Sequence, residues 1–167
     1  GILQVSPGVP VQACYTDSLD AAGSQVERCE SLSVIGGTDG SVEATVVVQP
    51  GDSVRVRVSD GDVNRDAGAI DAGAVTVVNT RTGERETVAV AEISPDAAVF
   101  YGALHTAGGS GPGGNDDGVL LALKSDDLRI EYDDALTASG IAAVRTDTTR
   151  TVQPFGDASG NGNVRGF

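Results

Sequence analysis

The sequence predicts an all-β protein built as a sandwich of two sheets, and three observations predict it. Short segments rich in Val and Thr alternate apolar and polar residues, which is the period of a strand with one buried face. Gly, Pro and Asp separate these segments at turns. No stretch of the sequence repeats apolar residues at the 3.6-residue period of an amphipathic helix.

The expected strands follow one another through the middle of the chain. Ser53–Ser59 (SVRVRVS) shows the alternation most clearly, directly after a Pro-Gly-Asp turn. Gly83 marks a hairpin turn, and Gly108–Gly114 (GGSGPGG) is expected to form a flexible hairpin tip. The full set of expected strands is 41–48, 53–59, 73–79, 85–93, 98–104, 119–123 and 128–132.

An internal repeat is the most informative feature of the sequence. When 117 is subtracted from their numbers, residues 118–148 align with residues 1–31 without a gap and with eight identities. The repeated segment reads YTDSLDAAG at Tyr15–Gly23 and YDDALTASG at Tyr132–Gly140. Chance similarity within a low-complexity β protein is the alternative, but ungapped identities with matching apolar positions favour repetition.

The repeat divides the chain into three parts. We expect residues 1–23 to be the closing hairpin of a preceding unit, residues 24–148 to form one sandwich, and residues 149–167 to be a strand or linker reaching the next unit. A lone two-stranded hairpin is marginal in water, and its free edges invite pairing. The hairpin is therefore expected to complete a neighbour by strand exchange, so copies of the same chain are the expected partners in a homopolymer.

The charge balance excludes several partners. The chain carries 24 Asp and Glu against 11 Lys and Arg, a net charge of −13, so nucleic acid and anionic membrane surfaces would repel it. No run of 18 apolar residues predicts a membrane span. Cys14 and Cys29 favour a structural disulfide over two free thiols, which indicates an oxidising, extracellular location.

Oxygen-bearing side chains alternate along the segment DGDVNRD, from Asp60 to Asp66. This spacing suits Ca²⁺, which takes six to eight oxygen ligands. Arg65 replaces the turn glycine of an EF-hand and no helices flank the segment, so an inter-strand calcium loop is expected. A polar turn capped by its own side chains is the alternative. The expected ligands are Asp60, Asp62, Asn64, Asp66, Asp71 and, from the repeated Tyr-x-Asp, Asp134.

No catalytic constellation emerges from the sequence. Pro112 breaks a nucleophile-elbow pattern around Ser110, and His105 is interpreted as a histidine at the end of a strand. Paired carboxylates could serve glycoside hydrolysis, but they fall in turns and the chain has no aromatic sugar platform. We therefore expect that the protein is not an enzyme and has no catalytic residues.

Several of these segments together resemble a known family. They are PGDSVRVRVSDGDVNRD, VTVVNTRTGERETVAVAE, VFYGAL, DDGVLLAL and LRIEYDDAL, between about residues 40 and 136. The sequence resembles the calcium-binding, immunoglobulin-like repeats of large secreted prokaryotic surface proteins, although Ala98 stands where their "GxFxG"-like strand has its first glycine. The resemblance implies an immunoglobulin-like β-sandwich in calcium-rigidified rods.

The function expected from the sequence is therefore structural. We expect a subunit of an extracellular filament or surface array, assembled by β-strand exchange and stiffened by Ca²⁺. One alternative is a segment of a long tandem-repeat adhesin. Another is an accessory module of an extracellular hydrolase.

Overall fold

A computed structural model describes residues 1–153, and within them the chain forms strands and turns without a helix. The expectation for the C-terminal strand or linker at 154–167 lies outside the described residues. The strands are β1 Pro10–Asp17, β2 Val26–Ser33, β3 Ser41–Ala44, β4 Val47–Val48, β5 Ser53–Ser59, β6 Ala72–Asn79, β7 Arg85–Glu92, β8 Val99–Gly108, β9 Val119–Ala122, β10 Asp127–Asp134 and β11 Ala143–Thr151.

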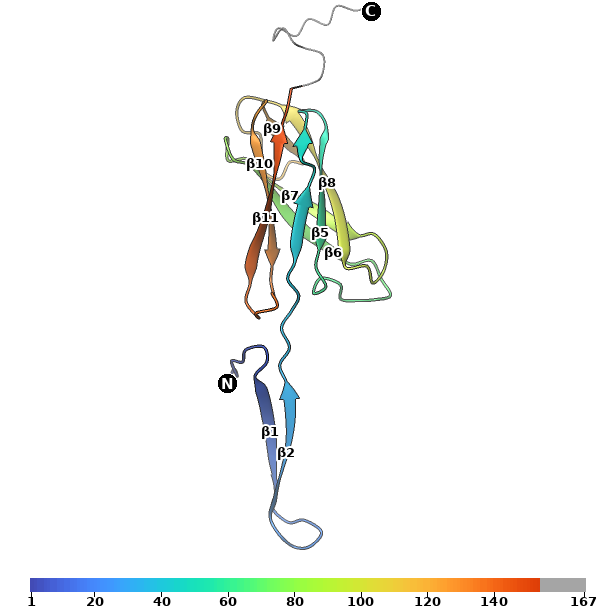
Figure 1. The fold of residues 1–167 in the computed structure, drawn as a ribbon, viewed down its shortest axis with the longest axis vertical. Coiled ribbons are helices and arrows are strands. Elements are labelled where there is room, and N and C mark those ends of the chain that lie inside the picture. The colour runs from blue at the N-terminus through green and yellow to red at the C-terminus, as the bar shows by residue number, and fades with distance from the viewer. Residues whose placement is uncertain (154–167) are drawn as a thin grey trace, which may run out of the picture.

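Strands β3 to β11 form one curled sheet in the order β3-β5-β8-β7-β6-β10-β11-β4, with β9 paired to β8. The sheet folds over on itself as a sandwich, and the β1–β2 hairpin projects from one end of it along the long axis (Figure 1). The prediction of an all-β sandwich is confirmed. The expected strand 41–48 is divided, because β3 pairs with β5 while β4 pairs with β11 at the other end of the strand order.

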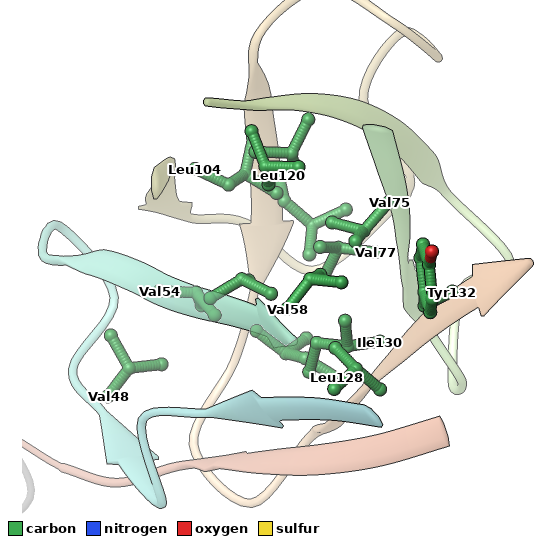
Figure 2. Close-up of a cluster of buried hydrophobic side chains, with 14 of the residues drawn as sticks. Val48, Val54, Val58, Val75, Val77, Leu104, Leu120, Leu128, Ile130 and Tyr132 are labelled. Atoms are coloured by element: carbon green, nitrogen blue, oxygen red, sulfur yellow. The ribbon is translucent and has the colours of Figure 1, made fainter. Parts of the chain in front are cut away.

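The core lies between the two layers and consists mostly of valines with a few larger side chains (Figure 2). Alternation along the strands produces it: Val54, Val56 and Val58 of β5 are at most 1% exposed, while the arginines between them point outward. On β10, Leu128 and Ile130 are fully buried and Tyr132 nearly so. Fully burying a side chain of this kind contributes about 1.5–3 kcal/mol.

The glycine-rich segment is not the hairpin tip that the sequence predicted. Strands β8 and β9 on either side of it pair in parallel, and parallel pairing needs a crossover instead of a tight turn. The segment runs beside β7, where the amide of Gly113 donates to the buried carboxylate of Glu84 and that of Gly118 to the buried carboxylate of Glu86. Glu84 also accepts from the amide of Leu121, and these donors explain how the two carboxylates tolerate burial.

The predicted boundary between residues 23 and 24 needs correction. It falls within the first hairpin, because β2 pairs only with β1 and not with the sandwich. The hairpin therefore extends to Ser33, and residues 34–40 connect it to β3. The second boundary, at residue 149, falls within β11, which pairs with β10 and β4 as part of the sandwich.

An ion pair between a buried aspartate and a partly exposed arginine lies at the end of the sandwich opposite the first hairpin. Asp126 is 4% exposed, and its carboxylate oxygens accept from Nε and Nη2 of Arg81 at 2.5 and 2.8 Å. The amide of Leu123 and the side-chain amide of Asn79 also donate to it. The hydrogen bond from Arg81 is the main cause that lowers the pKa of Asp126 to about 2, against the opposing effect of burial.

This ion pair generates a prediction about acid stability. The pKa of Asp126 is lower in the folded chain than the ~3.9 of an unfolded aspartate, so its stabilisation is complete above about pH 4 and is lost as the pH falls toward 2. We expect Asp126→Asn to lower the free energy of unfolding at pH 7 by ~2 kcal/mol. Urea unfolding at a series of pH values measures both effects. The exposed Asp133→Asn is the control, and equal acid dependence in both variants would contradict the assignment.

Candidate docking site

The first predicted metal ligands bind the segment that connects the first hairpin to the sandwich. Asp60 is buried, and its carboxylate accepts from the hydroxyl of Tyr132 at 2.5 Å and from that of Thr38 at 3.2 Å. Asp62 accepts from the amide of Thr38 at 2.7 Å. Burial and then the Asp60 carboxylate raise the pKa of Tyr132 above its ordinary value, which keeps the hydroxyl protonated as a donor.

The next three predicted ligands organise the loop between β5 and β6. One carboxylate oxygen of Asp71 accepts from the amides of Arg65 and Asp66, at 2.6 and 2.9 Å. Asp66 accepts from the amide of Gly68. The side-chain nitrogen of Asn64 donates to Asp96, and its oxygen is buried without a hydrogen-bond partner among the described residues.

The last predicted ligand, Asp134, forms an ion pair. Its carboxylate is fully buried, accepts from the amide of Gly40 at 2.9 Å, and contacts Nη2 of Arg145 at 2.9 Å. The same guanidinium group reaches Asp39 at 3.0 Å. The hydrogen bond to Asp134 is the main cause that raises the pKa of Arg145. Arg145 therefore already neutralises the charge that was expected to face a cation.

The six predicted ligands thus lie in three neighbouring arrangements. Within the described part of the chain, the one group of three metal-ligating side chains whose ligand atoms lie within 4.8 Å of one another is Cys14, Glu27 and Cys29, and its sulfurs form a disulfide. Calcium binding by the β5–β6 loop stays a prediction. In the structure, Asp60, Asp62 and Asp134 hold the connection 34–40 through Thr38 and Gly40, while Asp66 and Asp71 hold the β5–β6 loop together.

The first hairpin is a second copy of the β10–β11 hairpin. Adding 117 to the bounds of β1 gives those of β10, and adding it to Val26–Ser33 gives 143–150 within β11. The pairing register is also the same, since Tyr15 lies opposite Arg28 as Tyr132 lies opposite Arg145. The predicted repeat therefore corresponds to two hairpins of the same construction.

The turns of the two hairpins match in detail. Gly23 and Gly140 both adopt a positive φ, +78° and +80°, which glycine tolerates without strain. The amide of Gly23 donates to Asp20 at 2.9 Å, and that of Gly140 to Thr137 at 2.8 Å. Because backbone contacts agree as well as residue types, the similarity is a structural repeat and not a coincidence of composition.

The two hairpins differ in what covers them. In the sandwich, one face of β10 is buried in the core through Leu128, Ile130, Tyr132 and Asp134. The equivalent face of the first hairpin, which we call the core-equivalent face, is largely exposed. It comprises Val11, Ala13, Tyr15, Asp17, Val26, Arg28, Glu30 and Leu32. Tyr15 is 67% exposed, whereas Tyr132 is 4% exposed.

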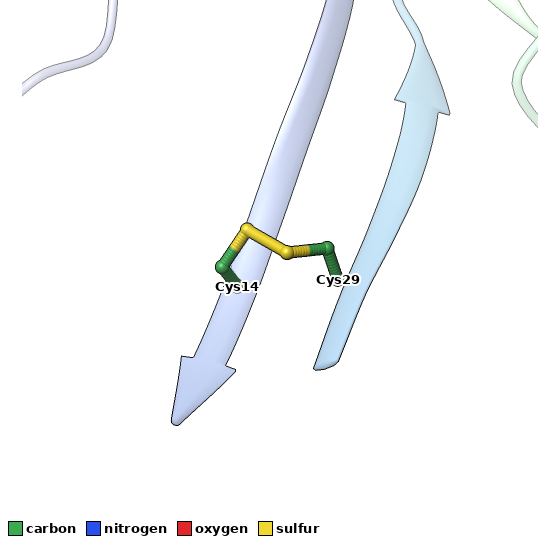
Figure 3. Close-up of a disulfide and its surroundings, with 2 residues drawn as sticks. All are labelled: Cys14 and Cys29. Carbon is green, nitrogen blue, oxygen red and sulfur yellow. A yellow bond between two sulfur atoms is a disulfide. The ribbon is translucent and has the colours of Figure 1, made fainter. Parts of the chain in front are cut away.

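The disulfide lies on the opposite face of this hairpin. Cys14 pairs with Cys29 across β1 and β2 (Figure 3), at the position that Glu131 and Thr146 occupy in the sandwich. Glu131 and Thr146 point away from the core, so the disulfide leaves the core-equivalent face free. The predicted bridge is confirmed.

A close-packed joint fixes the base of the hairpin to the sandwich. The amide of Gly37 donates to the carbonyl of Thr137, and a Cβ added at Gly37 would lie 1.9 Å from the carbonyl oxygen of Leu136. A Cβ added at Gly140 would lie 2.6 Å from Pro7. Glycine is needed at both positions because the chains approach this closely, and the turn of β10–β11 thereby contacts the base of the first hairpin.

Sequence reasoning missed several of these residues. Tyr132 and Arg145 belonged to the recognised repeat, but the repeat gave no sign that they bind Asp60 and Asp134. Glu92, whose carboxylate accepts from the amides of Asp71 and Ala98, showed no signal beyond strand alternation. Contacts between residues so far apart in the chain follow from the sheet order, which the sequence did not provide.

Comparison with family models and with the curated proteins finds no relative. No family model matches the chain, and none of the curated proteins matches its sequence. Within residues 1–153, no helix has the length and apolar character needed to cross a membrane. The likeness to immunoglobulin-like surface repeats therefore stays a hypothesis based on the motifs themselves.

The exposed hairpin generates a prediction about the disulfide. A two-stranded hairpin without a covering layer is marginal in water, and closing a loop of this size with a disulfide contributes ~3 kcal/mol. We expect the double variant Cys14→Ser, Cys29→Ser to lose amide hydrogen-exchange protection in β1 and β2 while β5, β6 and β10 keep theirs. Unchanged protection in β1 would show that the hairpin does not depend on its bridge, and lost protection in β10 would show that the sandwich depends on it too.

Proposed function

We propose that the protein is a structural module of an extracellular filament or surface array in which β-sandwiches are joined end to end. The first hairpin serves as the closing hairpin of a neighbouring sandwich. The observation that carries this proposal is the exposed core-equivalent face on a hairpin whose strand bounds, register and turn repeat those of β10–β11. The resemblance to immunoglobulin-like surface repeats supports the same function.

Docking of this face would be favourable for the reasons that hold β10–β11 in place. Tyr15 and Leu32 are 67% and 64% exposed, and burying side chains of this size contributes about 1.5–3 kcal/mol each. The bridge between Cys14 and Cys29 holds the strands paired before docking. Less conformational entropy is then lost on association, so a preorganised hairpin binds better than a flexible chain.

The arrangement along the chain supports an end-to-end assembly. The hairpin projects along the long axis of the sandwich, away from the end where β11 finishes (Figure 1). The joint of Pro7, Gly37 and Gly140 contacts both hairpins and sets their relative position. A neighbour that receives the first hairpin would therefore continue the same axis, as a filament or array requires.

The proposed location is extracellular. A disulfide is consistent with an oxidising compartment, and the net charge of −13 is consistent with a well-hydrated surface. A long tandem-repeat adhesin is the second candidate, and the 117-residue offset between the two hairpins favours it. In that case the neighbouring sandwich would belong to the same polypeptide. We propose no catalytic role.

Variants of the core-equivalent face test the assembly. We expect Tyr15→Ser with Leu32→Ser to abolish regular end-to-end particles in electron micrographs of native surface material, because the face then loses its largest apolar groups. The control is Thr16→Ala with Ser31→Ala on the disulfide face, which should leave the particles intact. Normal arrays with the Tyr15 and Leu32 variant would contradict the proposal.

Stiffening by calcium is the second part of the proposed function. The side-chain oxygen of Asn64 is buried without a hydrogen-bond partner among the described residues, and the hydrogen bonds of Asp66 and Asp71 use one carboxylate oxygen of each. These remaining oxygens support a loop that takes a hard cation. We expect millimolar Ca²⁺ to raise the melting temperature of the full chain and Asp66→Asn with Asp71→Asn to reduce that rise. Identical melting with Ca²⁺ and with chelator would remove calcium from the proposal.

A further inference from the structure

The core-equivalent face also indicates which sandwich can receive it. We infer that its acceptor is a β-sandwich of the same architecture and not a second copy of this chain. The acceptor's side chains that face the hairpin differ in size from those of this chain. This inference rests on the proposed function, because it concerns the neighbour that the first hairpin closes. The side chains of the first hairpin differ at several positions from those of β10–β11, whose acceptor is the sandwich itself.

Near the turn, the two hairpins present the same groups. Tyr15, Asp17 and Arg28 stand where Tyr132, Asp134 and Arg145 stand, and Leu19 matches Leu136. In the sandwich, these positions bind the Asp60 carboxylate, the Gly40 amide and the Asp39 carboxylate, respectively. The acceptor is therefore expected to offer a buried carboxylate to the Tyr15 hydroxyl, a backbone amide to Asp17 and a second carboxylate to Arg28.

At the other end of β1, the side chains are smaller than their counterparts. Val11 stands in place of Leu128, and Ala13 in place of Ile130. Leu128 and Ile130 are fully buried in the core beside Val54, Val58 and Val77 (Figure 2). In this chain's own sandwich, Ala13 would leave a void where Ile130 packs, because a close-packed core refills such space only in part.

On β2 and at the residue directly after it, the side chains are more apolar than their counterparts. Leu32 stands in place of Thr149, and Val34 in place of Thr151, both of which are buried. The hydroxyl of Thr149 donates to the carbonyl of Thr45 at 2.6 Å, and that of Thr151 donates to the carbonyl of Leu123 and accepts from the amide of Asp126. Leu32 and Val34 cannot make these hydrogen bonds. The carbonyl of Thr45 would lose its hydroxyl donor, and the Asp126 amide and the Leu123 carbonyl would keep only the hydrogen bond between them.

Together these differences describe the acceptor. It carries bulkier apolar side chains facing β1, an apolar recess for Leu32 on β2, and two carboxylates at the turn end. A second copy of this chain matches the first hairpin only at the turn end. In that copy, the position of the closing hairpin is already occupied by its own β10–β11. The better acceptor is a sibling sandwich that lacks a closing hairpin of its own and has complementary side-chain sizes.

A graft within the full chain tests the inference. The face variant places the β1–β2 side chains on the closing hairpin: Leu128→Val, Ile130→Ala, Thr149→Leu and Thr151→Val. The control variant makes the matched changes on the outward face: Arg129→Gln, Asp133→Thr, Thr148→Ser and Arg150→Ser. Urea unfolding is measured for both. We expect the face variant to lose at least roughly 100-fold in the folding equilibrium constant, up to failure to fold, and the control to change little.

The opposite result overturns the inference. If the core-equivalent face fits the site that β10–β11 occupies in this sandwich, the face variant will unfold at the same urea concentration as the control. A second measurement uses the unmodified chain, whose sedimentation is expected to be that of a monomer at all concentrations and to be unaffected by Tyr15→Ser. Self-association that Tyr15→Ser abolishes would make a second copy the acceptor, which defeats this inference while leaving the proposed assembly in place. The proposed assembly fails separately, if native arrays do not need the hairpin.

Discussion

A two-stranded hairpin is stable in water only when one of its faces is buried against another layer, and the rest of the structure depends on this constraint. In the sandwich, β10–β11 meets it by burying Leu128, Ile130 and Tyr132 against the core and by exchanging polar contacts with Asp60 and Gly40. The contact with Gly40, and that of Arg145 with Asp39, also hold the connection before β3, so the closing hairpin both covers the core and positions this connection. The first hairpin repeats the construction without the cover.

The two faces of the exposed hairpin differ in a way that fits the proposed assembly. Its disulfide lies on the face that stays outward in the sandwich copy, and its apolar and ion-pairing groups lie on the other face. At the joint, Gly37 lies close against Leu136 and Gly140 close against Pro7, which leaves little freedom between hairpin and sandwich. A rigidly held, preorganised and uncovered hairpin is what we expect of a connecting element in an extended assembly. In the proposed assembly, its side-chain sizes would determine which neighbour can receive it.

The sequence predicted local features well and distant contacts poorly. Alternation identified β5, and the offset of 117 residues revealed the repeat, although the hairpin predicted at 1–23 ended before β2. The crossover at 108–114 was mistaken for a hairpin tip, since parallel pairing of β8 and β9 has no local signature. Asp134 was predicted as a metal ligand, and its ion pair with Arg145 could be seen only once β10 and β11 were paired. Strand β11 itself was not among the expected strands, although it matches β2.

The central claim is that the core-equivalent face of the first hairpin is covered in the native assembly. Amide hydrogen exchange tests this claim most directly, by comparing β1 in the isolated chain with β1 in native surface material. The free edge of β1 would gain a strand partner on docking, as β10 has β6 in the sandwich. We expect exchange across Pro10–Asp17 to slow strongly on assembly while exchange in β5 stays the same. Equal exchange rates for β1 in the two samples would contradict it.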